Sequence, residues 1–482
     1  MRSLKLVNTL ALTLLLSYGC TSKVSTKVEC EQVPSQFKEE NEGPNWCVMD
    51  WWEIFEDTQL NCLMDMALEN SPTLDLAISR VLEAQAIYGR TYADLWPNIT
   101  FDPYDQQTGL LQPAIPPLGT RRQHLREYLI PVNLVWEVDL FGRLGYQADS
   151  AFNTFQAQKA AFWGVRLTLT AEIATTYFDL RANIRLKKIL EETLRVRREA
   201  LEINQSRYQA GLINYLDVSR AALEVSRALT AYQRIDENIL MNVNHLAFLV
   251  GEYPSLFQIE SSPIENDPPP LSAGIPSEVL VNRPDIIEAF FNMQAQADIV
   301  KARKAALFPT FIVTGTLGLF SPDSSELFNW RARFWQWMIE ASQTIYDFGR
   351  KFEDIDASKA VFRQTVDDYI ETVLFAFEEV ENALVLKRLS ALELTSIRES
   401  IENADLTRTL ARDRYLNGLI NYLDVVDAER DLLQAQSDEV NTIFDQYRAV
   451  INIAKAIGGK WTEPHYNEAA EVTAEEVPDP CP

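Results

Sequence analysis

Apolar side chains follow a helical period in the longest segments of this chain. Between Val218 and Val250 they recur at alternating spacings of four and three residues, which is typical of a coiled-coil seam. Between Val165 and Ile184 two neighbouring apolar stripes predict a helix that packs against two others. Proline is absent from 132–253 and from 323–463, so both intervals are predicted to hold very long helices, the first from about residue 142 to 207. On periodicity alone, the core of a large helical bundle is an alternative interpretation.

A second pattern, of period two, fills the shorter segments between these helices. Apolar and polar residues alternate over 128–138, 311–319 and 335–345, and a weaker strand begins after Pro97 at Ile99. Each half of the chain is therefore predicted to carry one hairpin of strands of about ten residues, apolar on one side and polar on the other, as transmembrane strands are.

Four strands cannot close on themselves in lipid, because an open edge would leave backbone groups unpaired there. A barrel must then be shared between copies of the chain. Known transmembrane barrels begin at about eight strands, so two, three or four copies would all satisfy closure.

The chain is also internally duplicated. The segment RYQAGLINYLDV at 207–218 returns as RYLNGLINYLDV at 414–425, with ten of twelve positions identical. The same offset of 207 maps the FGR triplet at 141–143 onto 348–350, and an offset of 212 maps Pro97 onto Pro309. A repeat of this length is too long for a solenoid unit, so we expect a duplicated half-domain with internal pseudo-symmetry.

The N-terminus predicts the compartment. Basic residues precede an apolar run at 6–16, which is typical of a secretory signal and too short to span a bilayer. Cys20 then stands where a lipoprotein signal peptide is cut and the new N-terminal cysteine is acylated; an ordinary secretory signal is the alternative. No other stretch approaches the roughly 18 apolar residues of a membrane-spanning helix, so a membrane crossing would have to use strands.

Composition narrows the possible partners and chemistry. A net charge of −25 argues against nucleic acid as a partner. The histidines are solitary, and neither a zinc-protease motif, a nucleophile elbow nor a phosphate-binding loop occurs, so we expect no enzyme activity, cofactor or metal site. Four further cysteines are scattered, and whether any pair forms a disulfide cannot be read from their spacing: Cys30, Cys47, Cys62 and Cys481.

Several motifs, in order along the chain, resemble the TolC-like outer-membrane efflux proteins, in particular their lipoprotein (NodT-type) branch. They are the two FGR turns, the duplicated RY-G-LDV segments, Pro276-Ser277-Glu278, Arg283-Pro284-Asp285-Ile286, and an opening formed by Trp51-Trp52, Phe55, Asp57, Leu60, Ala67-Leu68, Asn70, Leu74, Ala77, Arg80 and Pro97. The resemblance covers essentially residues 20–460.

The resemblance implies a mostly α-helical chain with a pair of transmembrane β hairpins. Three copies would form a 12-stranded outer-membrane β-barrel that continues into a long α-helical barrel through the periplasm. The corresponding divisions are a signal peptide (1–19), a lipidated and equatorial segment (20–60), a first repeat (61–251; strands about 98–139, tip about 207–218), an equatorial linker (252–283), a second repeat (284–458; strands about 310–346, tip about 414–427) and an acidic tail (459–482).

The implied function is the exit duct of a tripartite efflux system, anchored by lipid in the outer membrane of a bacterial cell. Its implied partners are a periplasmic membrane-fusion adaptor and an inner-membrane pump of the RND type, and its implied cargo is small toxic molecules. Two alternatives are a protein-export duct on the same frame and a lipid-anchored coiled-coil scaffold without a pore.

The helical hairpin tips are the candidate gate and adaptor-docking surface. Glycine permits the positive φ of a tight reversal, and asparagine can cap the next helix together with an aspartate three residues on. The tip residues are Gly211, Leu212 and Asn214 in the first repeat and Gly418, Leu419 and Asn421 in the second.

The repeats differ at one informative place, where the first tip has Asp217 and Arg220 and the second has Asp424 and Asp427. By resemblance, Asp424 and Asp427 match the aspartates that ring the periplasmic aperture, where three copies would favour cations. Tyr415 matches a tyrosine of the family's gating network, but Ile420 stands where some members have a basic residue. We hypothesise that Arg220 replaces it by pairing with Asp424 or Asp427 across adjacent hairpins. Helix capping is the alternative role for the two aspartates Asp217 and Asp424.

Overall fold

A computed structural model describes residues 37–38, 50–113, 120–260, 262–272 and 282–458. The signal peptide, the acidic tail and four of the five cysteines lie outside these residues, and the fifth, Cys62, is a free, exposed thiol. The described chain divides into two compact units: one from 80–158 and 288–370, the other from 50–79, 159–287 and 371–458. Each unit takes residues from both sequence repeats.

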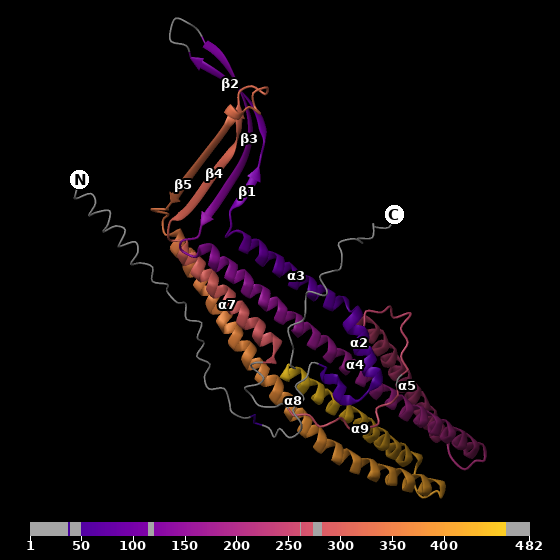
Figure 1. Cartoon of the computed structure of the whole chain (residues 1–482). Coiled ribbons are helices and arrows are strands. Elements are labelled where there is room, and N and C mark those ends of the chain that lie inside the picture. The colour runs from indigo at the N-terminus through magenta and orange to yellow at the C-terminus, as the bar shows by residue number, and fades with distance from the viewer. Residues whose placement is uncertain (1–36, 39–49, 114–119, 261, 273–281, 459–482) are drawn as a thin grey trace. The chain divides into compact units, whose positions relative to one another are not determined.

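The long helices predicted from the proline-free intervals are present (Figure 1). Helices α4 (Arg143–Gln209) and α8 (Arg350–Leu416) have 67 residues each, and each is followed by a returning helix, α5 (Tyr215–Leu249) and α9 (Tyr422–Ile457). At 1.5 Å per residue, 67 residues extend about 100 Å. None of the described helices combines the length and the apolar character that a membrane-spanning helix needs.

The shorter helices repeat the duplication. Helices α3 (Pro72–Ala93) and α7 (Pro284–Ala305) both have 22 residues and both begin at a proline, which is favoured at the first helical position. In the first repeat, α3 is preceded by a 3₁₀ helix, η1 (Trp51–Phe55), and by α2 (Thr58–Asn70).

A single antiparallel sheet contains the strands of both repeats. Strands β1 (Asn98–Phe101) and β2 (Tyr104–Pro113) pair with successive parts of β3 (Thr120–Val138), so they act as one strand interrupted at residues 102–103. Strand β3 then pairs with β4 (Thr310–Ser321), and β4 pairs with β5 (Arg333–Ser342), which follows the short η2 (Trp330–Ala332). The two predicted hairpins are confirmed, and β3 at 19 residues is longer than predicted.

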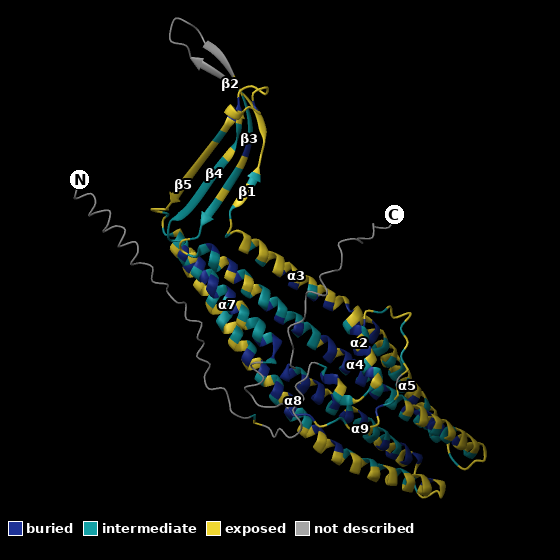
Figure 2. Cartoon of the chain, in the orientation of Figure 1, coloured by how far each residue is buried: buried dark blue, intermediate teal, exposed yellow. Residues whose placement is uncertain are grey.

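The register separates polar from apolar rows across the four strands. One row is polar throughout, aligning Thr100, Asn133, Thr316 and Gln336. The Thr316 hydroxyl lies 3.1 Å from Asn133 Oδ1 within this row. The adjacent row on one side is apolar and aligns Phe101, Val132, Leu317 and Trp335. In these two rows the alternation predicted from sequence is therefore continuous across the sheet. Many residues with apolar side chains are exposed in the single chain, and Figure 2 shows that most of β5 is exposed.

The strands of the two repeats meet closely at Gly318. A Cβ placed on Gly318 would lie 2.3 Å from the carbonyl oxygen of Ile130 and 2.9 Å from Cα of Pro131. Glycine at this position therefore permits the close approach of β4 to β3.

The ends of α5 and α9 dock in the same way in both repeats. Gly251 and Gly458 have φ of +79° and +83°. A Cβ on Gly251 would lie 2.2 Å from the carbonyl oxygen of Asn70, and one on Gly458 would lie 2.5 Å from that of Asn282. The glycines are related by the offset of 207 and the asparagines by the offset of 212, so duplication preserved a backbone contact along with the sequence.

Asp57 links the start of α2 to α4. Asp57 caps α2 by accepting hydrogen bonds from the backbone N–H groups of Gln59 and Leu60, at 3.0 and 3.1 Å. The same carboxylate accepts from the Tyr177 hydroxyl at 3.0 Å and from Arg181 at 2.5 Å. These bonds attach the start of α2 to α4.

Candidate gate at the helical hairpin tips

Both tips use the turn chemistry expected from the sequence. Gly211 and Gly418 have φ of +72° and +71°, and in each case open space surrounds the missing Cβ, so the backbone conformation alone requires glycine. Asn214 Oδ1 accepts a hydrogen bond from the backbone N–H of Leu216 at 2.8 Å and so caps α5.

The second tip has a capping box. The backbone N–H of Asn421 donates to Asp424 Oδ2 at 3.2 Å, and Asn421 is the N-cap of α9. The capping role predicted as the alternative for Asp424 is thus confirmed. Because only one of its oxygens is used in this bond, and because the residue is exposed, the carboxylate can still face solvent.

A buried apolar cluster, here called the tip core, joins the two hairpins just above the turns. Its buried members are Ala221, Tyr415, Tyr422, Val425 and Val426, with Leu201, Ala411 and Ile420 packed against them. These residues come from α4, α5, α8, α9 and the second turn, so the tip core holds both hairpins of one chain together. Its composition also explains why an isoleucine can occupy position 420: the side chain contributes to apolar packing.

Tyr415 is the polar centre of this cluster. Its hydroxyl donates to Asn204 Oδ1 of α4, and the two residues are only 8% and 1% exposed. The Arg207 guanidinium lies 4.9 Å from the centre of the Tyr415 ring. Burial raises the pKa of Tyr415 although Arg207 opposes the shift, so the hydroxyl remains a donor at physiological pH.

Asn204 and Arg207 were not identified from the sequence. Arg207 belongs to the duplicated motif and could have been found as a basic residue one position before a tyrosine in each repeat. Nothing in the pattern marked Asn204, which is a buried polar residue on a helix whose partner becomes visible only when α4 and α8 pack together.

The charged residues of the tips pair along their own helices. Arg220 Nη1 lies 3.9 Å from Asp217 Oδ1, and Arg430 Nη1 lies 3.5 Å from Asp427 Oδ1. Both are three-residue spacings on a helix face. Arg220 thus pairs with Asp217 in this chain, and its pairing with Asp424 or Asp427 across adjacent hairpins stays a prediction.

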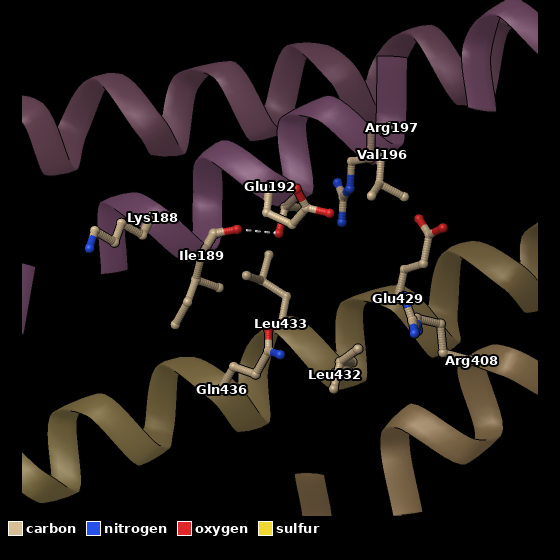
Figure 3. Close-up of a pocket in the computed structure, with 11 residues that line it drawn as sticks. Lys188, Ile189, Glu192, Val196, Arg197, Arg408, Glu429, Leu432, Leu433 and Gln436 are labelled. Carbon is tan, nitrogen blue, oxygen red and sulfur yellow. Dashed lines mark hydrogen bonds between the residues drawn. The ribbon is translucent and has the colours of Figure 1, made fainter. Parts of the chain in front are cut away.

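A cavity lies farther from the turns, between α4, α8 and α9 (Figure 3). Its volume is about 320 Å³, and its walls include apolar side chains such as Ile189, Val196 and Leu432. Glu429 points into it from α9, opposite Arg197 of α4 and near Arg408 of α8. Burial raises the pKa of Glu429, and the positive charges of Arg197, Arg408 and Arg412 only partly offset this effect.

No cluster of histidine, cysteine, aspartate and glutamate that could hold a metal ion occurs within the described ranges. At the tips, a buried contact joins the two helical hairpins, and exposed carboxylates lie close to it. Together with the long helical hairpins and the exposed four-stranded sheet, it defines a TolC-like outer-membrane channel.

Comparison with known proteins agrees with this class. The family model described as outer membrane efflux protein matches residues 63–252 and 275–459. The chain therefore belongs to the outer membrane efflux protein family. It is 30% identical over 416 residues to the solvent efflux pump outer membrane protein SrpC of Pseudomonas putida, covering 85% of this chain and 87% of the relative. It is 26% identical over 447 residues to the cation efflux system protein CusC of Escherichia coli K12, covering 92% and 96%.

Solved structures show the same fold. The outer-membrane channel OprN superposes with a TM-score of 0.82 at 26% identity, covering 91% of this chain and all of that one. A structure of CusC gives 0.80 at 25% identity over the same share of this chain. The resemblance inferred from the sequence motifs is thus confirmed: the chain is an efflux channel of the outer membrane that extends into the periplasm, and it is not an enzyme.

Proposed function

We propose that three copies of this chain form the exit duct of a tripartite efflux pump, closed at the periplasmic end by the tips of its helical hairpins. Two features of the single chain support a shared wall. Strands β1 and β5 are the edges of the sheet. The indole rings on β5 are largely exposed, at 73% for Trp335 and 65% for Trp337. An unpaired edge with exposed apolar side chains on a strand requires a partner in lipid. Three chains would supply twelve strands, four from each chain, and twelve helical columns.

The tip core is the observation that carries the proposed gate. It ties α8 and α9 to α4 and α5 through Tyr415, while Asp424 and Asp427 lie exposed immediately beyond it. Around a threefold axis these aspartates would place six carboxylates at the aperture, favouring cations and repelling anions. Opening then requires the second hairpin to move away from the first, which breaks the Tyr415–Asn204 hydrogen bond.

The remaining predicted features complete this proposal. Cys20 would carry the lipid anchor, and the exposed turn residues Leu212 and Leu419, at 70% and 73% exposed, would contact the periplasmic adaptor. An inner-membrane pump of the RND type would deliver the cargo. Relatives named for solvent efflux and for cation efflux are both similar to this chain, so small toxic molecules of either kind are the proposed substrates.

A susceptibility test in the native bacterium addresses the function directly. Deletion of the gene should increase sensitivity to organic solvents, antibiotics or metal cations, and expression of the intact chain should restore resistance. The matched control is a chain with Cys20→Ala, which keeps the duct but removes the proposed anchor. Unchanged sensitivity together with the loss of a secreted protein would instead indicate a duct for protein export.

A further inference from the structure

The most heavily bonded charged group near the tips is Glu224 of α5, which the proposed gate does not yet use. Its side chain is 4% exposed and contacts three arginines. Arg197 of α4 donates to Glu224 Oε2 at 2.5 Å, and Arg227, one turn along α5, donates to Oε1 at 2.8 Å. The third, Arg430, comes from α9 of the other hairpin and donates to both carboxylate oxygens.

This cluster, here called the Glu224 hub, has the buried pair of Glu224 and Arg197 at its centre, and Arg227 and Arg430 reach it with side chains that are 54% and 41% exposed. Arg197 is also 4% exposed, and it donates a second bond to the backbone carbonyl of Glu224 at 3.3 Å. Burial disfavours the ionised carboxylate, but the hydrogen bonds and charges of Arg430 and Arg197 outweigh burial and hold the pKa of Glu224 below its ordinary value. Glu224 is therefore charged at physiological pH, and removing its charge would leave the buried Arg197 without its counter-charge and Arg430 without its partner on the first hairpin.

Arg430 connects the hub to the aperture. Its Nη2 bonds Glu224, while its Nη1 lies 3.5 Å from Oδ1 of Asp427, one turn away on α9. One guanidinium thus joins the first hairpin to a carboxylate of the proposed gate, using the forked geometry that arginine offers to two acceptors.

The hub lies between the tip core and a cavity. The tip core begins about one helical turn from the hub, at Ala221 of α5 and Val426 of α9. On the other side, the cavity of about 320 Å³ lies beside Arg197, between α4 and the second hairpin, so apolar packing there is incomplete. Movement of α9 away from the first hairpin would therefore separate the ion pairs of the hub together with the tip core.

The hub also breaks the internal symmetry. At the offset of 207, Glu224 corresponds to Asp431, Arg197 to Ala404, and Leu223 to Arg430. Asp431 is exposed, so the second repeat has the acid without the surrounding arginines. Each chain therefore contains one such connection, from α5 to α9, and it is confined to the junction between its two hairpins.

We propose that Glu224 is a positioning residue of the gate: through Arg430 it latches α9 to the first hairpin and so holds Asp427 in the closed aperture. This proposal rests on the proposed function, which defines the closed state of the channel. The contact between α5 and α9 can be measured independently, as the distance between the two helices. It predicts that loss of the Glu224 charge separates α5 from α9 near the tips and raises the probability that the channel is open.

The test measures both quantities on the intact trimer in lipid. Spin labels at Ser219→Cys and Asp431→Cys, both exposed positions on α5 and α9, report the separation by pulsed electron resonance, with the native cysteines other than Cys20 replaced. Planar-bilayer recordings report the open probability. Glu224→Gln keeps the shape of the side chain, and Glu199→Gln is the matched control, because Glu199 is exposed and pairs only along α4 with Arg195.

Glu224→Gln should lengthen or broaden the distance between the labels and raise the open-to-closed ratio about tenfold or more, whereas the Glu199→Gln control should change neither. Arg430→Gln should reproduce the effect, and combining it with Glu224→Gln should add little, because both act through one contact. Arg430→Gln also leaves the bond between Arg197 and Glu224 intact, so it provides the measurement should Glu224→Gln not assemble.

An unchanged label distance in an assembled Glu224→Gln or Arg430→Gln trimer would overturn the latch, whatever the conductance. A longer distance with unchanged conductance would support the latch and count against the aspartate aperture of the proposed function. The two ideas can therefore fail separately.

Discussion

Replacing Tyr415 by phenylalanine is the most informative perturbation of the tip core. The change removes one hydroxyl and keeps the ring that packs with Tyr422 and stacks under Arg207. Asn204 is 1% exposed, so its side-chain oxygen would lose its hydroxyl partner without gaining water. Leaving a buried acceptor unsatisfied costs about 1–3 kcal/mol.

That cost applies only while the two hairpins are packed together, because an opened tip exposes Asn204 to water. The closed arrangement should therefore lose stability relative to the open one, by a factor of about 5 to 150 in the equilibrium constant. Single-channel recordings in planar bilayers measure this ratio as the open probability of the purified trimer.

The duplication supplies a matched control. Tyr208 occupies the equivalent position in the first repeat, but it is 44% exposed. Tyr208→Phe should leave the open probability unchanged. The reasoning is wrong if Tyr415→Phe leaves the recordings as they are, or if Tyr208→Phe opens the channel to the same extent.

Three further substitutions test the fold and the electrostatics. Gly458→Ala should destabilise the protein by at least about 2 kcal/mol in thermal unfolding, because it combines positive φ with a backbone clash. Gly418→Ala, at positive φ in open space, should cost about 1 kcal/mol. Equal effects of the two substitutions would contradict the backbone contact at Gly458. Gly318→Ala should lower the temperature at which the detergent-resistant oligomer dissociates, and Gly315→Ala, whose Cβ would meet only ordinary contacts at 3.9 Å, should not. Burial raises the pKa of Glu429, so its ionised form destabilises the folded state. Glu429→Gln should therefore raise the melting temperature at pH 8, and this gain should shrink as the pH falls toward the pKa of an unfolded glutamate, about 4.3. A lower melting temperature of the variant at pH 8 would refute this assignment.

Elements with a strong local signal could be predicted from the sequence. Absence of proline and helical periodicity placed the first long helix within two residues of α4, and period-two alternation found the hairpins of the sheet. Both tip turns followed from glycine and asparagine, because the required φ and the cap depend on neighbouring residues only.

Contacts between distant segments could not be predicted in this way. The coiled-coil seam predicted between Val218 and Val250 is only partly confirmed. Its members Val218 and Leu246 are buried, but Ala222 and Leu229 are exposed within the chain, and the neighbouring Ala221, Glu224 and Ala228 are buried instead. A heptad pattern counts apolar residues, so it does not identify a buried glutamate that pairs with three arginines. The Glu224 hub became visible only when α4, α5 and α9 were packed together.

Assembly is the claim on which the account depends most directly, since the described part of one chain has two unpaired sheet edges and two helical hairpins. Native mass spectrometry of the purified protein, released from mild detergent, measures it. The account predicts one dominant species with three times the mass of the mature chain. A monomer that remains folded and lipid-bound, or a dominant assembly of two or four chains, would contradict it.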